Sequence, residues 1–174
     1  MNRYLIYLMF IFIVSSGFSQ KTNTDWPNLN KYKNSNIEVL SRPKTDKRIV
    51  LMGNSITEGW TNFYPEYFKN KDLINRGISG QTTPQMLIRF KPDVIDLNPD
   101  IVVMLAGIND IAENTGPSSI KMITDNITSM AKLAKSHNIN VILSSILPAY
   151  DFPWRPEIIP HYKILKINEF LQEY

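Results

Sequence analysis

Four short apolar runs along the chain predict the strands of a buried sheet. The first begins at Ile49 and stops at Gly53, and the others lie at residues 73–75, 101–105 and 141–146. Each run is short and continuous, which is typical of a strand buried on both faces of a parallel sheet. We therefore expect these four segments to pair in one sheet.

Helical spacing separates the strand-like runs. Apolar residues recur every three or four positions from 120 to 134, after a Pro-Ser-Ser sequence, which predicts an amphipathic crossover helix. Two more helices are expected at residues 84–97, with a break or turn at Pro92, and at residues 160–174. Strands alternating with helices predict an α/β fold whose parallel sheet is covered on both faces.

The first 19 residues have the pattern of a secretory signal peptide. Arg3 precedes an apolar run over residues 4–14, and Gly17 and Ser19 form a small-x-small cleavage site. The run is shorter than the roughly 20 residues of a membrane-spanning helix. We expect cleavage near Ser19 and an exported protein, periplasmic or secreted, without a stable membrane anchor. The alternative is that this segment forms a buried N-terminal strand.

Composition narrows the class of protein. Of the 174 residues, 43% are hydrophobic and 20% are charged, which is typical of one globular domain. The polar stretch 20–47 predicts a lead-in with a short helix, and residues 48–174 then form the domain. A net charge of only +3, without blocks of like charge, gives no support for nucleic-acid binding. The absence of cysteine excludes disulfides and thiolate nucleophiles.

Polar residues follow three of the predicted strands. These segments are Gly53-Asn54-Ser55-Ile56-Thr57, Asn75-Arg76-Gly77-Ile78-Ser79-Gly80 and Gly107-Ile108-Asn109-Asp110. Because ligands bind beyond the carboxyl ends of parallel strands, a serine hydroxyl, a glycine N–H and an asparagine amide are expected along one rim. A nucleophile beside donors for an oxyanion is the equipment of acyl transfer. Each residue alone also fits a helix N-cap.

The sequence does not match the motifs of other nucleotide-binding or hydrolase sites. Gly59 is followed by Trp60, so the P-loop pattern is absent, and Thr57 stands where the G-x-S-x-G elbow needs glycine. Gly77 and Gly80 do not complete a G-x-G-x-x-G sequence. With two widely separated histidines and no cysteine, we expect neither a metal nor a cofactor.

The three polar segments resemble the conserved blocks of the SGNH hydrolases, also called GDSL-type esterases and lipases. The resemblance implies a flavodoxin-like three-layer α/β/α sandwich and a nucleophile at Ser55. It further implies an oxyanion hole formed by the backbone N–H groups of Ser55 and Gly80 and the side-chain amide of Asn109. The chain is most similar to exported bacterial members that resemble platelet-activating-factor acetylhydrolase. Small acyl esters, either an acetyl ester of a carbohydrate or a lysophospholipid-type ester, are the implied substrates.

Two positions depart from the family pattern. Asn54 replaces the usual Asp of the first block; we expect it to keep a loop-fixing hydrogen bond and to tune the substrate site. The family's Asp-x-x-His block has no match. The residue three positions before His161 is Ile158, and the residue three positions before His137 is Ala134. We therefore expect a chain that is incomplete at its C-terminus, without the last strand and the catalytic Asp and His.

The loop after the fourth strand, residues 150–156, carries Tyr150 and Trp154. These aromatic rings could stack on a sugar or line an acyl pocket, or they could only cover the core. The expected partner is a small-molecule or glycan ester. Because the base is missing, a non-catalytic carbohydrate-binding module or an inactive fragment remains the alternative function.

Overall fold

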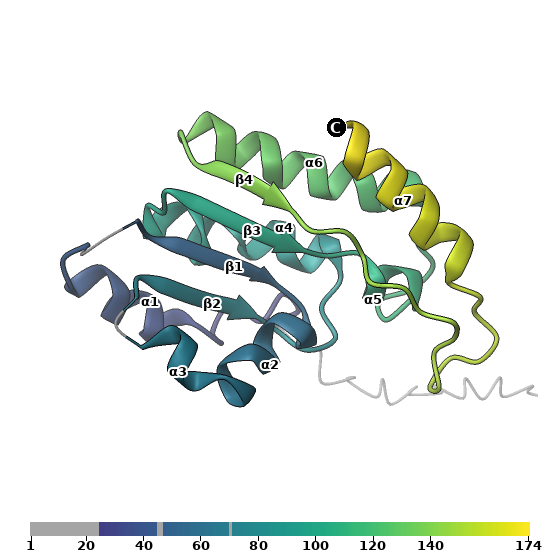
Figure 1. The fold of residues 1–174 in the computed structure, drawn as a ribbon, viewed down its shortest axis with the longest axis horizontal. Helices are drawn as coiled ribbons and strands as arrows, with labels where there is room; N and C mark the ends of the chain where they lie inside the picture. The colour runs from purple at the N-terminus through teal and green to yellow at the C-terminus, as the bar shows by residue number, and fades with distance from the viewer. Residues whose placement is uncertain (1–24, 45–46, 70) are drawn as a thin grey trace, which may run out of the picture.

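The structure, a computed structural model, describes residues 25–44, 47–69 and 71–174. Its sheet has four parallel strands in the order β2-β1-β3-β4, and Figure 1 shows their arrows pointing the same way. The strands are β1 (Ile49–Gly53), β2 (Leu73–Gly77), β3 (Ile101–Leu105) and β4 (Asn140–Leu143). The predicted parallel α/β fold is confirmed.

Two strands differ in length from the prediction. Strand β2 extends to Gly77, because Arg76 and Gly77 continue the pairing with β1 despite their polar or small side chains. Strand β4 ends at Leu143, where its register with Met104 ends, instead of continuing to Ile146. Among the described residues, β2 and β4 are the two edges of the sheet.

Helices connect the strands and flank the sheet. They are α1 (Lys33–Ser41), α2 (Ser55–Phe63), α3 (Pro65–Phe68), α4 (Thr83–Asp93), the 3-10 helix η1 (Ile95–Leu97), α5 (Ile108–Ile111), α6 (Ile120–Ser136) and α7 (His161–Glu173). Figure 1 shows α4 and α6 behind the sheet, and α2 and α3 near the β2 edge. The predicted break near Pro92 lies between α4 and η1, and Ser119 caps α6 by accepting a hydrogen bond from the Met122 N–H at 3.2 Å.

The two faces of the sheet are covered to different extents. On one face, Val50 and Val102 are fully buried in the main core. On the other, Leu51 and Val103 are only half-buried beside α2, and Ile142 of β4 is 50% exposed. Helices thus flank the sheet as expected, but α2, which packs against β1 and β2, leaves Ile142 of β4 half exposed.

The lead-in contributes the expected short helix, α1, to the domain. Its Val39 is buried in the core, and its Asn36 donates a hydrogen bond from Nδ2 to the Asp93 carboxylate at 2.8 Å. The predicted signal peptide lies outside the described residues. Within those residues, every helix is too short or too polar to span a bilayer.

Candidate active site

Ser55 begins α2 directly after β1, at the carboxyl edge of the sheet. The preceding residue, Asn54, caps this helix: its Oδ1 accepts a hydrogen bond from the Ile56 N–H at 3.0 Å. The first N–H groups of a helix lack intrahelical partners and carry the positive end of the helix dipole. The side chain of Ser55 is exposed, so a substrate can reach it where developing negative charge is stabilised.

Asn54 retains the loop-fixing hydrogen bond expected of the amide. Its side chain is buried, and Nδ2 has no hydrogen-bond partner among the described residues. The residue also lines a small cavity of about 20 Å³ with Leu105, Ile108 and Ile146, among others. A direct contact between Asn54 and substrate stays a prediction.

The segment after β2, residues 77–83, is named the Gly80 loop. Gly80 has φ +75°, in the left-handed region that glycine adopts without steric cost. Two side chains from the α5 region hold the loop: Asn114 donates from Nδ2 to the Gly80 carbonyl at 3.1 Å, and Asn109 donates from Nδ2 to the Gln81 carbonyl at 2.9 Å. Gly80 and Asn109 therefore lie close together, as the oxyanion-hole prediction requires.

Asn109 lies on α5 and is largely buried. A side-chain amide carries two N–H donors, and the bond to Gln81 uses one of them. Among the described residues, no second hydrogen bond of this amide is found.

The neighbouring Asp110 ties α5 to the start of α4. Its buried carboxyl accepts hydrogen bonds from the Thr83 N–H at 2.9 and 3.0 Å and from the Thr83 hydroxyl at 2.6 Å. Burial raises the pKa of Asp110 to about 6, although the Thr83 hydrogen bonds act in the opposite direction. This carboxyl fixes the end of the Gly80 loop from the interior.

Glu58 brings the Gly80 loop to the first turn of α2. Residues three apart on a helix share a face, so Glu58 lies on the same side of α2 as Ser55. Its Oε2 accepts a hydrogen bond from the backbone N–H of Ser79, the residue before Gly80, at 2.7 Å. The structure thus brings the predicted nucleophile and the other two predicted oxyanion donors to one edge of the sheet.

A polar groove of about 340 Å³ lies against the Gly80 loop. The lead-in supplies one wall of the groove, including Trp26, which is 41% exposed. Asn114 and Thr115, which follow α5, also line the groove. An aromatic ring among amide and hydroxyl groups suits a polar, ring-shaped ligand.

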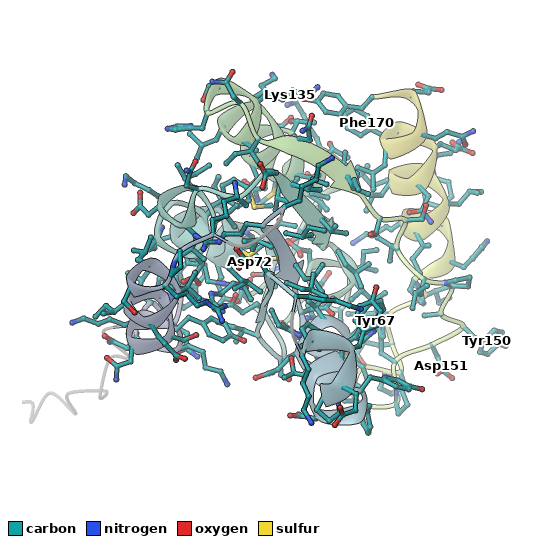
Figure 2. All side chains as sticks on the ribbon, turned by 60° about the vertical axis from the view of Figure 1, so that its left-hand side comes forward. Tyr67, Asp72, Lys135, Tyr150, Asp151 and Phe170 are labelled. Atoms are coloured by element: carbon teal, nitrogen blue, oxygen red, sulfur yellow. The ribbon has the colours of Figure 1, made fainter. Side chains whose placement is uncertain are left out.

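Tyr150 and Trp154 lie on the long connection between β4 and α7. Tyr150 is 92% exposed, and Figure 2 shows it pointing away from the body of the protein. Trp154 is 62% exposed and packs against the buried Phe152 ring at 5.4 Å between centroids. Arg155 pairs with Glu113 at 3.5 Å, which anchors this connection to the α5 region. A substrate contact by either aromatic residue stays a prediction.

Neither histidine makes a hydrogen bond to Ser55 among the described residues. His137 follows α6 and precedes β4, which puts it at the amino edge of the sheet, opposite Ser55. Its Nδ1 lies 2.9 Å from the Leu133 carbonyl. His161 begins α7, and no hydrogen bond joins it to Ser55 within the described part of the chain. In that same part, no group of three His, Asp or Glu side chains could hold a metal ion.

The sequence profile of the GDSL-like Lipase/Acylhydrolase family matches residues 51–174, more than half of the chain. The chain belongs to this family. The resemblance to SGNH hydrolases, predicted from the three polar blocks, is confirmed.

The chain is similar both to solved structures and to curated relatives. A GDSL-like lipase from Bacteroides thetaiotaomicron is 48% identical, with a TM-score of 0.82 over 85% of this chain and 73% of that chain. An arylesterase of Vibrio mimicus is 29% identical over 116 residues, 59% of this chain and 56% of the relative. The uncharacterized lipoprotein YqeF of Bacillus subtilis is 30% identical over 117 residues, 58% of this chain and 48% of the relative. The chain therefore spans about half the length of the curated relatives it matches.

Three residues that support the candidate site were not predicted from the sequence: Glu58, Arg89 and Asn114. Arg89 is fully buried; it pairs with Asp93 at 2.9 Å and donates to the Gly53 carbonyl, at the end of β1, at 3.2 Å. One signal was present for Arg89, since it occupies the buried face of α4 where an apolar side chain is expected. Asn114 gave no such signal because it lies in an irregular segment.

Proposed function

We propose that the protein is a serine esterase that cleaves small acyl esters through an acyl-enzyme at Ser55. The observation that carries the proposal is the convergence of Ser55, the Gly80 loop and the Asn109 amide at the carboxyl edge of the sheet. A non-catalytic binding domain has no need of a nucleophile beside oxyanion donors.

The reaction runs in two steps. The Ser55 hydroxyl loses its proton to a base, and its oxygen attacks the ester carbonyl carbon. The negative charge that develops on the carbonyl oxygen is stabilised by the N–H groups of Ser55 and Gly80 and by the Asn109 amide. The C–O bond to the alcohol then breaks, and the alcohol leaves with a proton. Water attacks the acyl-serine in the second step and releases the carboxylic acid and free Ser55.

The proposal requires a base for the Ser55 hydroxyl. A serine hydroxyl needs a base within about 3 Å, itself oriented by a third group. His137 lies at the amino edge of the sheet, and His161 makes no hydrogen bond to Ser55 in the part of the chain that the structure describes. An Asp-x-x-His segment, as the family resemblance implies, would meet this need.

An acetyl ester of a carbohydrate is the substrate class that the surroundings of Gly80 favour. The adjacent groove is polar and carries the exposed ring of Trp26, which suits a sugar better than a lipid chain. In the esterase we propose, Trp154 and Tyr150 add two further exposed rings on the connection tied to Glu113.

Export is part of the proposal. The signal pattern in residues 1–19 and the Bacillus subtilis relative, which is a lipoprotein, both support it. N-terminal sequencing or mass spectrometry of native protein is expected to find a mature chain that begins near Gln20. An intact Met1 would contradict export by this signal.

Hydrolysis of p-nitrophenyl acetate by the native protein tests the activity. Ser55→Ala is expected to abolish turnover, whereas Ser129→Ala, on the exposed face of α6, is expected to leave it unchanged. Acetylated xylo-oligosaccharides and a lysophospholipid, compared as substrates, separate the two ester classes. Near-normal rates for Ser55→Ala would refute the proposal, and sugar binding without turnover by the native protein would favour a carbohydrate-binding module.

A further inference from the structure

We propose that Glu58 is a positioning residue that fixes the direction of the Gly80 N–H, and that Lys31 of the lead-in holds Glu58 in place. This inference rests on the proposed function, because the Gly80 N–H matters for catalysis only if it binds the oxyanion.

The Glu58 carboxylate joins three parts of the chain. Its Oε2 accepts hydrogen bonds from the Ser79 N–H at 2.7 Å and from the Ser79 hydroxyl at 2.5 Å. Its Oε1 accepts a hydrogen bond from Lys31 Nζ at 2.7 Å. The lead-in, the helix that begins at Ser55 and the Gly80 loop therefore meet at one side chain.

This contact restrains the peptide that carries the Gly80 N–H. A peptide unit is planar, so the direction of that N–H depends on how the chain is held on each side of it. Glu58 holds the chain at Ser79, before this peptide, and Asn114 holds the Gly80 carbonyl after it at 3.1 Å. Because glycine has the greatest backbone freedom of any residue, loss of one of these restraints would leave the donor poorly directed.

Close packing leaves little slack between α2 and the strand before the loop. A Cβ atom added to Gly77 would lie 2.2 Å from the backbone nitrogen of Glu58, so only glycine fits at the end of β2. The first turn of α2 is thus fixed against β2, and the Glu58 side chain spans a set distance to Ser79.

The charge state of Glu58 suits this role. Burial raises its pKa, but the hydrogen bonds from Lys31 and Ser79 outweigh burial, so the pKa lies below the ordinary value for glutamic acid. The carboxylate is therefore ionised at neutral pH and accepts strong hydrogen bonds. Lys31 is 41% exposed, so salt should weaken its part of the contact.

Steady-state kinetics on p-nitrophenyl acetate test the proposal in the native protein. Glu58→Ala is expected to lower kcat by about 10- to 100-fold, less than the loss of a whole oxyanion donor, with KM nearly unchanged. Glu58→Gln keeps one acceptor oxygen and should recover part of this loss. Lys31→Met should lower kcat by about two- to fivefold, and 1 M salt should produce the same loss in the wild type but none in this variant.

The matched control is Glu66→Gln on α3. Glu66 forms an ion pair of similar length with Lys69, at 2.6 Å, without a hydrogen bond to the Gly80 loop among those found in the described residues. This variant is expected to keep the wild-type kcat. Hydrogen exchange supplies a readout besides activity: the Ser79 and Gly80 amides should exchange faster in Glu58→Ala than in the control.

The outcomes separate the two proposals. If Ser55→Ala abolishes hydrolysis while Glu58→Ala keeps wild-type kcat and wild-type amide exchange, the role of Glu58 is refuted and the proposed function stands. A change confined to KM would also refute it, because it would point to substrate binding. If Ser55→Ala retains activity, the proposed function fails, and the exchange rates alone decide whether Glu58 fixes the loop.

Discussion

The buried carboxyl of Asp110 makes the stability of this fold depend on pH in a predictable direction. Burial raises its pKa from the ordinary 3.8 to about 6. The folded chain then holds a proton on Asp110 that the unfolded chain releases between pH 4 and 6. The contribution of Asp110 to the free energy of unfolding is therefore largest at low pH. It declines as the pH rises through this window and levels off above the pKa of the folded state. The shift of about two pKa units corresponds to about 3 kcal/mol of unfolding free energy.

Asp110→Asn isolates this effect because an amide does not titrate and keeps one acceptor oxygen for Thr83. Urea unfolding of both proteins from pH 4 to 7.5 gives the difference in unfolding free energy, in which groups unaffected by the substitution cancel. Between pH 4 and 7, the unfolding free energy of the variant is expected to rise relative to that of the wild type by up to about 3 kcal/mol. A difference that is flat would refute the raised pKa. A difference that falls with pH would show that the hydrogen bonds from Thr83 outweigh burial.

Three other substitutions have expected outcomes. Asn109→Ala should lower kcat for p-nitrophenyl acetate by about 100- to 1000-fold, since it removes a proposed oxyanion donor; a loss below tenfold would contradict that role. Arg89→Met should lower the unfolding free energy by about 3 to 5 kcal/mol in urea titrations, because it leaves the buried Asp93 carboxylate without its cationic partner, and adding Asp93→Leu should recover part of the loss. Ser119→Ala should cost about 1 kcal/mol in the same titrations through loss of the α6 cap, and an unchanged midpoint would show that the cap contributes nothing.

The sequence pattern predicted most of the fold because the residues of each core strand themselves form a continuous apolar run. Continuous apolar runs marked β1 and β3, and Ser119 marked the start of α6. The end of β2 was missed because its last two residues pair with β1, which lies far away in sequence. The charged Arg76, although buried, interrupts the apolar pattern there. The end of β4 was missed because the buried Ile146 prolongs the apolar pattern past Leu143, where the strand ends.

Only the site residues that directly follow a strand could be predicted from the sequence. Ser55, Gly80 and Asn109 each follow a strand, so their convergence follows from a parallel sheet. The residues that hold them do not follow from this rule. Glu58 reaches Ser79 and Lys31 across 21 and 27 positions of sequence, and no local pattern encodes contacts of that range.

Covalent labelling of Ser55 is the most direct test of the central claim that this residue is the nucleophile of an acylhydrolase. The native protein is treated with a fluorophosphonate that modifies activated serines, and the modified peptide is located by mass spectrometry. The account predicts a single adduct on Ser55, its loss in Ser55→Ala, and loss of p-nitrophenyl acetate hydrolysis in step with labelling. An adduct on another residue, with Ser55 unmodified, would contradict it.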